Sequence, residues 1–266
     1  MSEQFKDKTV YWITGASSGI GKALALELAR PENAIILSGR NEQALTEIKQ
    51  IVNATSYAEV LAFDMLRMDE FPEIVVRAIR FFGHIDVLVN NAGVSQRSAA
   101  METSTEVEKK LMDINYFSQV ALTKALLPHM VERKKGHLVN ISSIAGKFGF
   151  GLRSTYAAAK HAMLGYFEAL RLELKDVPIY VTNVCPGRVL TNVSYNAMKG
   201  DGTSHNVLDD GQRKGISAET CAKGILKAIK SRKHEVLLGK LELIPVYLRR
   251  YCPPLFYYLI KRIKPT

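Results

Sequence analysis

The sequence lacks the marks of several large classes of protein. It has only three cysteines, Cys185, Cys221 and Cys252, and their odd number and wide spacing indicate reduced thiols, without a metal site or a secreted disulfide framework. No apolar signal segment precedes the first strand-like run, so we expect a cytoplasmic protein that is not exported. No uninterrupted apolar run reaches about eighteen residues, the length that a membrane-spanning helix needs. There is also no nucleic-acid-binding motif, and we expect no nucleic-acid partner.

What the chain does have is the composition of a folded globular protein. Hydrophobic residues make up 47% of its 266 residues and charged residues 23%, which is enough for the core of one large α/β unit. The formal net charge of +10 is spread without a long basic run, and such a surface suits anionic small molecules or anionic lipid. Composition changes only where residues 241–266 mix apolar, aromatic and basic side chains. We therefore predict one domain over residues 1–240 and a C-terminal appendage at 241–266.

Short apolar runs rich in β-branched residues alternate with helical patterns along the chain. The strand-like runs are residues 9–14, 34–39, 59–64, 85–93, 137–143, 179–187 and 234–239. The helical patterns are residues 19–30, 41–54, 69–82, 103–134, 154–175 and 217–230. Strands that are each followed by a helix indicate βαβ units with right-handed crossovers. The order predicts an α/β fold with a doubly wound, Rossmann-like parallel sheet of about seven strands and helices on both faces.

A glycine-rich turn, TGASSGIG at residues 14–21, lies between the first predicted strand and the first helix. Gly15, Gly19 and Gly21 would let the backbone turn sharply and approach a pyrophosphate at the helix N-terminus. The spacing differs from the common G-x-G-x-x-G fingerprint, and a plain tight connection is the alternative. Its place in the first βαβ unit favours a dinucleotide-binding site.

Arg40 and Asp64 follow the second and third predicted strands. Dinucleotide folds that select NAD usually carry an acid after the second strand, whereas an arginine accommodates the 2′-phosphate of NADP. Arg40 therefore favours NADP over NAD, although a solvated loop cation is its alternative interpretation. Asp64 could accept from the adenine amino group or could only cap the segment that follows.

Six motifs occur in the order and spacing of a known family. They are TGASSGIG (14–21), NNAG (90–93), Asn115, Ser143, YAAAK (156–160) and PGRVLT (186–191). On these motifs the chain resembles the short-chain dehydrogenases/reductases, and the match runs from Lys8 to about Gly239. It is most similar to the branch that contains 11β-hydroxysteroid dehydrogenase and related membrane-associated reductases.

The resemblance implies a catalytic set of Asn115, Ser143, Tyr156 and Lys160. Tyr156 would be the general acid/base, Ser143 would hydrogen-bond the substrate oxygen, and Asn115 would anchor a water of the proton relay. A free phenol has a pKa of about 10, and a lysine ammonium about 4 Å away would bring it toward about 7. Lys160, one helical turn after Tyr156, is placed to do so and in the family also holds the nicotinamide ribose. A polar residue on a solvent-facing helix surface is the alternative for Asn115.

Cofactor contacts are expected along all of these motifs. The glycine turn, the strand ends and the resemblance together predict contacts from Gly15, Ser17, Ser18, Gly19, Ile20, Gly21, Arg40, Asp64, Asn91, Ala92, Gly93, Tyr156, Lys160, Pro186, Gly187, Val189 and Thr191. In the NNAG motif Asn90 is also favoured. The family transfers the pro-S hydride, with the carboxamide fixed by groups like the Val189 backbone and the Thr191 hydroxyl. As alternatives, Pro186 and Gly187 could form an ordinary turn and Thr191 a helix N-cap.

These residues predict an NADP(H)-dependent oxidoreductase that interconverts a secondary alcohol and a ketone or aldehyde. A steroid-, retinoid- or lipid-like substrate is favoured, and a 3-oxoacyl or small-carbonyl reductase or a non-catalytic NADP-binding sensor are the alternatives. Residues 192–216 form a polar segment where family members place a substrate lid. The appendage 241–266 could cover an apolar substrate entrance, rest on an anionic membrane surface, or pack as a helix or dimer contact. We also expect a homodimer or homotetramer.

Overall fold

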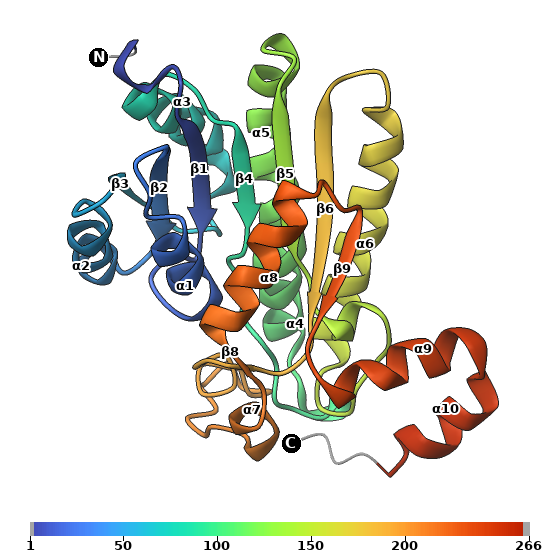
Figure 1. Cartoon of the computed structure of the whole chain (residues 1–266). Helices are drawn as coiled ribbons and strands as arrows, with labels where there is room; N and C mark the ends of the chain where they lie inside the picture. Colours follow the sequence, from blue (N-terminus) through green and yellow to red (C-terminus); the bar gives the residue numbers. More distant parts are fainter. Residues whose placement is uncertain (1–2, 263–266) are drawn as a thin grey trace.

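Seven parallel strands form the central sheet in the order β3-β2-β1-β4-β5-β6-β9 (Figure 1). The computed structural model describes residues 3–262 of the chain. The strands are β1 (Thr9–Thr14), β2 (Asn33–Gly39), β3 (Tyr57–Ala62), β4 (Val87–Asn90), β5 (Gly136–Ile141), β6 (Ile179–Pro186) and β9 (Glu235–Leu238). The strand order reverses between β1 and β4, the kind of point at which open α/β sheets bind ligands. The predicted doubly wound, Rossmann-like sheet is confirmed.

Helices cover both faces of the sheet because strand side chains alternate between two hydrophobic cores. On one face lie α3 (Phe71–Phe82), α5 (Ser118–Glu132) and α6 (Ser154–Glu173), with α4 (Thr105–Met112) beside α6. On the other lie α1 (Gly19–Glu27), α2 (Glu42–Val52) and α8 (Ala218–Lys230). In β1, Val10 and Trp12 join the first core, and Tyr11 and Ile13 join the second. Each such buried side chain contributes about 1.5–3 kcal/mol.

The helix predicted over residues 103–134 is interrupted, which corrects that prediction. After α4 the chain forms a π-helical turn, Asp113–Phe117, before α5 begins at Ser118. The side-chain amide of Asn115 donates to the carbonyl of Leu111 at 2.9 Å, an acceptor that an α-helix reserves for a backbone amide. Competition for this carbonyl accounts for the wider turn. It also aims the Asn115 side chain inward, where it is fully buried.

Several predicted strands end earlier than expected, and their last residues form loops at the carboxyl edge of the sheet. Strand β4 stops at Asn90, and β5 stops at Ile141. Ser143, expected as the last residue of the fifth strand, instead caps the 3-10 turn η5 (Ile144–Gly146). Its hydroxyl accepts a hydrogen bond from the Ala145 amide at 3.1 Å. The edge toward which the strands point therefore carries most of the motif residues.

Residues 192–216, expected as a polar loop, have a defined arrangement below the carboxyl edge of the sheet (Figure 1). The segment contains the short helix α7 (Asp210–Arg213). Strands β7 (Val189–Leu190) and β8 (Ile216–Ser217) pair in parallel at its two ends. Within it, Met198 forms isolated bridges to Gln96 and Ser204. We call residues 192–216 the lid segment.

The C-terminal appendage folds back toward the same edge of the domain (Figure 1). It consists of η6 (Leu241–Leu243), α9 (Ile244–Tyr251) and α10 (Pro253–Ile260), and residues 263–266 lie outside the described residues. Phe256 is buried in a small core with Ile144 and Phe148, and its ring centroid lies 5.4 Å from that of Phe148. Within residues 3–262, no helix combines the length and the apolar character needed to cross a membrane.

Candidate active site

The glycine-rich turn between β1 and α1 depends on glycine at its key positions. Gly15 and Gly19 have φ angles of +65° and +54°, in the left-handed region that side chains disfavour. A Cβ on Gly21 would lie 2.3 Å from the carbonyl oxygen of Gly15. Ser18 is the N-cap of α1, and within the described chain its side chain makes no cap hydrogen bond. The first amides of α1, at Gly19, Ile20 and Gly21, can therefore bind a pyrophosphate.

The NNAG segment after β4 packs directly on this turn. The side-chain amide of Asn91 donates to the carbonyls of Thr14 at 2.9 Å and Gly15 at 3.1 Å. A Cβ on Gly15 would lie 2.9 Å from the Cα of Ala92. Asn91 and Ala92 thus hold the glycine-rich turn in shape at the point where β1 and β4 diverge.

Asn90 has a different role from the cofactor contact that the sequence favoured. Its side chain is fully buried and donates to Thr123 and to Asn140, each at 3.0 Å. These bonds join β4 to α5 and to β5. The expectation that Asn90 touches the cofactor is therefore wrong, because its amide is enclosed inside the domain.

Arg40 is exposed directly after β2, beside the glycine-rich turn. The hydroxyl of Ser17 lies 3.5 Å from the position of a Cβ on Gly39. Ser17 therefore lies next to the end of β2, the strand that Arg40 directly follows. Asp64 follows β3, and its carboxylate accepts from the Leu66 amide at 3.0 Å. This bond matches the capping alternative for Asp64.

The segment PGRVLT, residues 186–191, lies against the glycine-rich turn although it is distant in sequence. A Cβ on Gly19 would lie 3.2 Å from the Cγ2 atom of Thr191. The Thr191 hydroxyl donates to the carbonyl of Val189 at 3.3 Å, and Val189 is buried in β7. Pro186 is the last residue of β6. The structure therefore brings the two motifs together at the carboxyl edge of the sheet.

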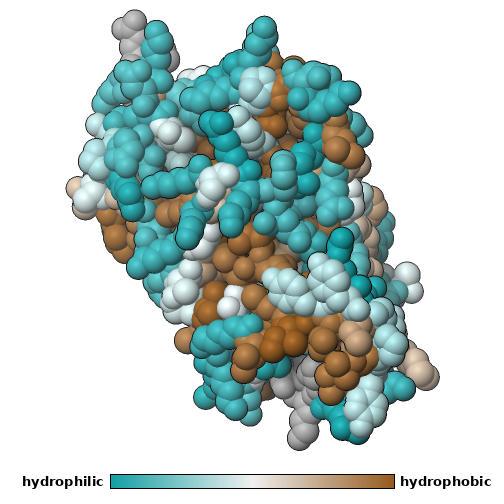
Figure 2. Space-filling model, turned by 45° about the vertical axis from the view of Figure 1, so that its right-hand side comes forward, coloured by the Kyte–Doolittle hydropathy of each residue, from teal (hydrophilic) through white to brown (hydrophobic). Residues whose placement is uncertain are grey.

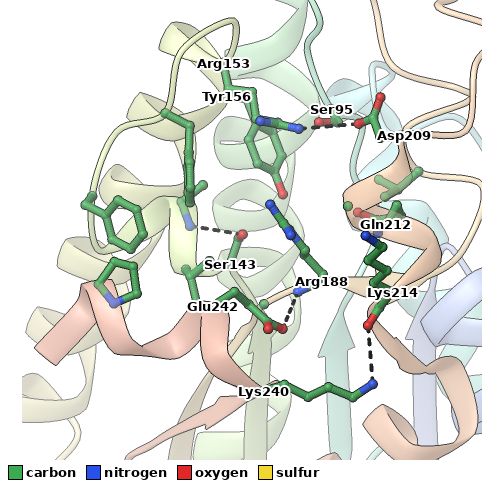
Figure 3. A pocket seen from close by; sticks show the side chains of 18 of the residues that line it. Ser95, Ser143, Arg153, Tyr156, Arg188, Asp209, Gln212, Lys214, Lys240 and Glu242 are labelled. Carbon is green, nitrogen blue, oxygen red and sulfur yellow. Dashed lines mark hydrogen bonds and ion pairs between the residues drawn. The ribbon is translucent and has the colours of Figure 1, made fainter. Parts of the chain in front are cut away.

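Glu242 of the appendage is bound to this same segment. Its carboxylate accepts from the backbone amide of Arg188 at 3.0 Å (Figure 3). A Cβ on Gly187 would lie 2.6 Å from the same carboxylate oxygen, so a side chain at position 187 would displace Glu242 from this position. Glu242 therefore fixes the backbone of Arg188. The next residue is Val189, whose backbone is expected to hold the nicotinamide carboxamide.

A cavity of about 540 Å³ opens at the carboxyl edge, and both Ser143 and Tyr156 line it (Figure 3). Its other walls come from the loop after β4, from η5 and the loop that follows it, from the lid segment and from the appendage. A volume of this order accommodates a small organic substrate. The hydroxyls of Ser143 and Tyr156, which the sequence assigns to the chemistry, thus line the same cavity.

Burial raises the pKa of Tyr156 above its ordinary value of 10.0. A hydrogen bond with Ser143 and the positive charges of Arg153 and Arg97 act in the opposite direction and favour the phenolate. Desolvation is the largest of these causes, so the phenol is neutral at neutral pH, and the expectation that Lys160 brings the pKa of Tyr156 toward about 7 is wrong. The arrangement presents Tyr156 to the cavity as a proton donor.

Lys160 is buried one helical turn after Tyr156. Its ammonium donates to the Ile141 carbonyl at 2.9 Å and lies 5.9 Å from the centroid of the Tyr156 ring. Burial lowers the pKa of Lys160 to about 8. Gly93 faces both Lys160 and Asn115, since a Cβ there would lie 3.6 Å from Nζ and 2.7 Å from the Asn115 Oδ1. The four residues predicted as the catalytic set thus gather beyond the ends of β4 and β5.

An ion pair beside the cavity was not predicted. The Nε atom of Arg97 donates to the carboxylate of Asp209 at 2.8 Å, and the two side chains are only 3% and 4% exposed. Arg153, the N-cap of α6, lies 3.5 Å from the same oxygen. The pair ties the lid segment to the loop after β4 and to the start of α6. No sequence spacing indicated it, because Arg97 and Asp209 are 112 positions apart.

Other residues at the site were also missed by the sequence pattern. They are Gln96, Arg188 and Gln212, and the side-chain amide of Gln212 donates to the Val189 carbonyl. Each is a polar residue in a loop or short element, where no periodicity marks its direction. Within residues 3–262, no group of three or more His, Cys, Asp or Glu side chains is arranged to hold a metal ion.

Comparison with known proteins identifies relatives of the whole chain. A family model described as short chain dehydrogenase matches residues 9–201. Dehydrogenase/reductase SDR family member 7B of Rattus norvegicus is 41% identical over 264 residues, covering 96% of this chain and 81% of the rat protein. Dehydrogenase/reductase SDR family member 7 of Homo sapiens is 36% identical over 261 residues, covering 96% of this chain and 77% of the human protein.

Solved structures share the fold. A short-chain dehydrogenase/reductase from Burkholderia phymatum in complex with NAD has a TM-score of 0.82 at 24% identity, with 98% of this chain and 97% of that chain covered. A short-chain dehydrogenase from Streptomyces avermitilis has a TM-score of 0.81 at 28% identity, with 96% of each chain covered. An alcohol dehydrogenase from Thermococcus sibiricus, complexed with 5-hydroxy-NADP, has a TM-score of 0.74 at 22% identity, with 88% and 97% covered.

Proposed function

The chain belongs to the short-chain dehydrogenase family, and from that premise we propose that it is an NADP(H)-dependent oxidoreductase that interconverts an alcohol with a ketone or aldehyde. The observation that carries the proposal is that Ser143 and Tyr156 line one cavity. Lys160 and Asn115 lie behind them, beside Gly93. A protein that only sensed the dinucleotide would not need two hydroxyls directed at a substrate cavity. The family fold binds a nicotinamide dinucleotide, and the glycine-rich turn between β1 and α1 fits the pyrophosphate of that cofactor.

The side chains divide the work as follows. A bound dinucleotide would supply the hydride for reduction of the carbonyl group. Ser143 donates a hydrogen bond to the carbonyl oxygen as negative charge develops there. Tyr156 then gives its phenolic proton to that oxygen, which completes the alcohol. Because burial keeps the phenol protonated, Tyr156 is in the protonation state that carbonyl reduction requires.

Two positive groups help Tyr156 to release its proton. The charges of Arg153 and Arg97 favour the phenolate, although burial opposes them. Lys160, one turn after Tyr156 on α6, would hold the nicotinamide ribose. Asn115 fixes the loop after β4, because its side-chain amide donates a hydrogen bond to the Val94 carbonyl at 2.9 Å. These residues would let the proton lost by Tyr156 be replaced after each turnover.

The preference for NADP rests on Arg40. It follows β2 beside Ser17, and no acidic residue follows that strand before Glu42. A guanidinium and a hydroxyl form a suitable pair for a 2′-phosphate. An acid at the position of Arg40 would instead favour NAD.

The substrate is proposed to carry apolar surface. Phe148, Phe150, Leu241 and Pro245 line the cavity, and the last two belong to the appendage. We further propose that the appendage rests on an anionic membrane surface, as its exposed apolar and basic side chains suggest. Figure 2 shows a brown, hydrophobic area over the lower part of the molecule, where α9 and α10 lie.

The test is cofactor oxidation over a panel of carbonyl compounds graded by hydrophobicity, with NADPH and NADH compared. We expect NADPH-dependent reduction that rises with the apolar character of the substrate. Tyr156→Phe should retain cofactor binding and lose about 10²- to 10⁴-fold in kcat, because only the transferable proton is removed. Full activity of Tyr156→Phe would remove the acid/base role. Failure of every carbonyl to oxidise NADPH would favour the non-catalytic sensor.

A further inference from the structure

The substrate cavity is strongly positive. Its lining carries five cationic side chains and two carboxylates, an excess of three positive charges; the seven are Arg97, Arg153, Arg188, Lys214, Lys240, Asp209 and Glu242. Both carboxylates are engaged within the protein, Asp209 with Arg97 and Arg153, and Glu242 with a backbone amide. A cavity for a neutral, wholly apolar substrate has no need of this charge.

Arg188 is the half-buried cation of this lining whose side chain has no acceptor among the described residues, whereas Lys214 and Lys240 are exposed to solvent. Arg97 and Arg153 face Asp209, and the ammonium of Lys240 donates to the carbonyls of Lys214 and Gly215 at 3.3 Å each. Among residues 3–262, the guanidinium of Arg188 makes no hydrogen bond and no ion pair. A half-buried guanidinium without an acceptor is unfavourable, and it is a ready partner for an acid.

The position of Arg188 directs its guanidinium into the cavity. The side chain extends toward the hydroxyl of Tyr156 (Figure 3). It lies flat against the lid segment, where a Cβ on Gly211 would be 2.8 Å from its Cζ atom. Glycine at 211 therefore makes the room that the guanidinium occupies. The backbone of Arg188 is in turn held by Glu242.

The same cavity has an apolar wall. Phe148 and Phe150 pack against each other with ring centroids 4.5 Å apart, and Leu241 and Pro245 of the appendage line the cavity with them. Leu241 is 79% exposed, so this wall continues to the molecular surface. One space thus offers an unmatched guanidinium and a path of apolar side chains.

We propose that the cavity binds an amphiphilic carbonyl compound. Its acidic group, a phosphate or carboxylate, pairs with Arg188, and its hydrocarbon chain lies along the wall formed by Phe150, Leu241 and Pro245, with the buried Phe148 packed behind Phe150. A planar guanidinium binds either acid with two parallel hydrogen bonds. Lys214, exposed at the rim of the cavity, adds positive potential that attracts the acid. The proposal rests on the proposed function, because it names the substrate class of that site.

Binding measured by calorimetry separates this proposal from turnover. The probes are decyl phosphate, 1-decanol and inorganic phosphate, each titrated into the full chain with and without NADP⁺. We expect decyl phosphate to bind at least about tenfold more tightly than either other probe, and to bind also in the presence of NADP⁺. Equal binding of decyl phosphate and 1-decanol would overturn the role of the acid. Equal binding of decyl phosphate and inorganic phosphate would overturn the amphiphile, and competition with NADP⁺ would assign Arg188 to the cofactor.

The matched variants are Arg188→Gln, Arg188→Lys and, as a control, Lys175→Gln, which removes an exposed charge just after α6. Arg188→Gln should weaken decyl phosphate about tenfold or more, Arg188→Lys should weaken it less, and the control should not change it. If Arg188→Gln does not fold, the comparison of Arg188→Lys with the control decides. Unchanged affinity in the Arg188 variants would overturn the proposal.

A kinetic experiment distinguishes the proposed reductase function from the proposed acidic, amphiphilic substrate class. The substrates are a medium-chain keto acid and its methyl ester, each with NADPH. Preference for the acid, reduced by Arg188→Gln, supports both proposals. Reduction of acid and ester alike, with no effect of Arg188→Gln, leaves the proposed function standing and removes this substrate class. Tight binding of decyl phosphate without reduction of any carbonyl removes the proposed function and leaves the binding site.

Discussion

The side-chain carbonyl of Gln96 accepts hydrogen bonds from the backbone amide of Tyr156 at 3.2 Å and from that of Thr155 at 3.0 Å. The first amides of a helix have no partner inside the helix, and here a fully buried residue 60 positions earlier supplies one. The side-chain amide of Gln96 donates in turn to Ser98 and Thr103, at 3.2 and 3.1 Å. Gln96 therefore fixes the start of α6, and with it Tyr156, to the loop after β4.

Gln96→Leu should disturb both stability and catalysis. Leucine has a similar volume but leaves the amides of Thr155 and Tyr156 without an acceptor, which costs about 1–3 kcal/mol of unfolding free energy. A small displacement of Tyr156 should also lower kcat by about tenfold or more, because proton transfer depends on distance. Urea unfolding and steady-state kinetics measure the two effects. Gln43→Leu on the exposed surface of α2 is the control and should change stability by less than about 0.5 kcal/mol.

Arg40→Gln should weaken NADPH selectively. Loss of a charge-assisted hydrogen bond to the 2′-phosphate costs about 1.5–3 kcal/mol, which raises KM for NADPH by about 10- to 100-fold. NADH lacks this phosphate, so its KM should change far less. Arg77→Gln removes an exposed arginine from α3 and serves as the control. Equal losses for NADPH and NADH would show that Arg40 does not read the phosphate.

The sequence was sufficient to predict the sheet, because the order of strands and helices depends on local pattern, whereas the catalytic set was predicted from the motifs of the family resemblance. Strand and helix alternation determined the order of the layers, and parallel strands bring their carboxyl ends to one edge. Ser143 lies just after β5, and Tyr156 and Lys160 lie one turn apart on α6. The π-helical turn was missed because apolar periodicity continues through it, and only the bond from Asn115 to Leu111 reveals it.

The rest of the site could not be predicted because its contacts are long-range and polar. Gln96 reaches α6 across 59 and 60 positions, and Arg97 reaches Asp209 across 112. Neither pair repeats a spacing that a helix or strand would impose. Arg188 belongs to the motif at residues 186–191, whose expected role is to place backbone groups at the cofactor. Only the folded structure shows that the Arg188 side chain lines the cavity beside the lid segment. The sequence therefore located the proposed catalytic residues better than the residues proposed to bind the substrate.

His137 should make stability depend on pH. It is 6% exposed, burial lowers its pKa from 6.5 to about 4, and its Nε2 lies 2.8 Å from the Thr182 hydroxyl. Because the folded pKa is depressed, the unfolded chain takes up a proton first as the pH falls below 6.5. The stability that the neutral, buried His137 contributes is therefore fully present above pH 6.5 and is lost as the pH falls through about 4. Between about pH 7 and about pH 5, His137 should remove about 2 kcal/mol of unfolding free energy.

Urea unfolding at the two pH values checks the contribution of His137. His137→Gln should lose stability at neutral pH but show a smaller further decrease on acidification than the original chain. His234→Gln, a substitution of an exposed histidine, should keep the original decrease. An unaltered pH dependence in His137→Gln would mean that another group is responsible.

The appendage should bind anionic membranes through exposed side chains on α9 and α10. Tyr251, Leu255 and Tyr257 are 76%, 42% and 56% exposed, and Arg249 and Arg250 lie on the same helix pair. Truncation at residue 241 would be a poor test, because it also removes the buried Phe256 and Glu242, which holds the backbone at Arg188. Serine at Tyr251, Leu255 and Tyr257 removes the apolar contact and leaves these interactions in place.

Flotation with vesicles of phosphatidylcholine, with or without phosphatidylserine, measures this binding. The original chain should float with the anionic vesicles and less at high salt, because basic side chains contribute. The triple serine variant should bind at least about tenfold more weakly, since it loses most of the area that would enter the interface. A control triple variant carries serine at Ile51, Val76 and Leu172, which are 56%, 48% and 73% exposed on α2, α3 and α6, and should float like the original chain. If both triple variants float equally, the membrane contact lies elsewhere; if the original chain does not float, the appendage serves only to enclose the cavity.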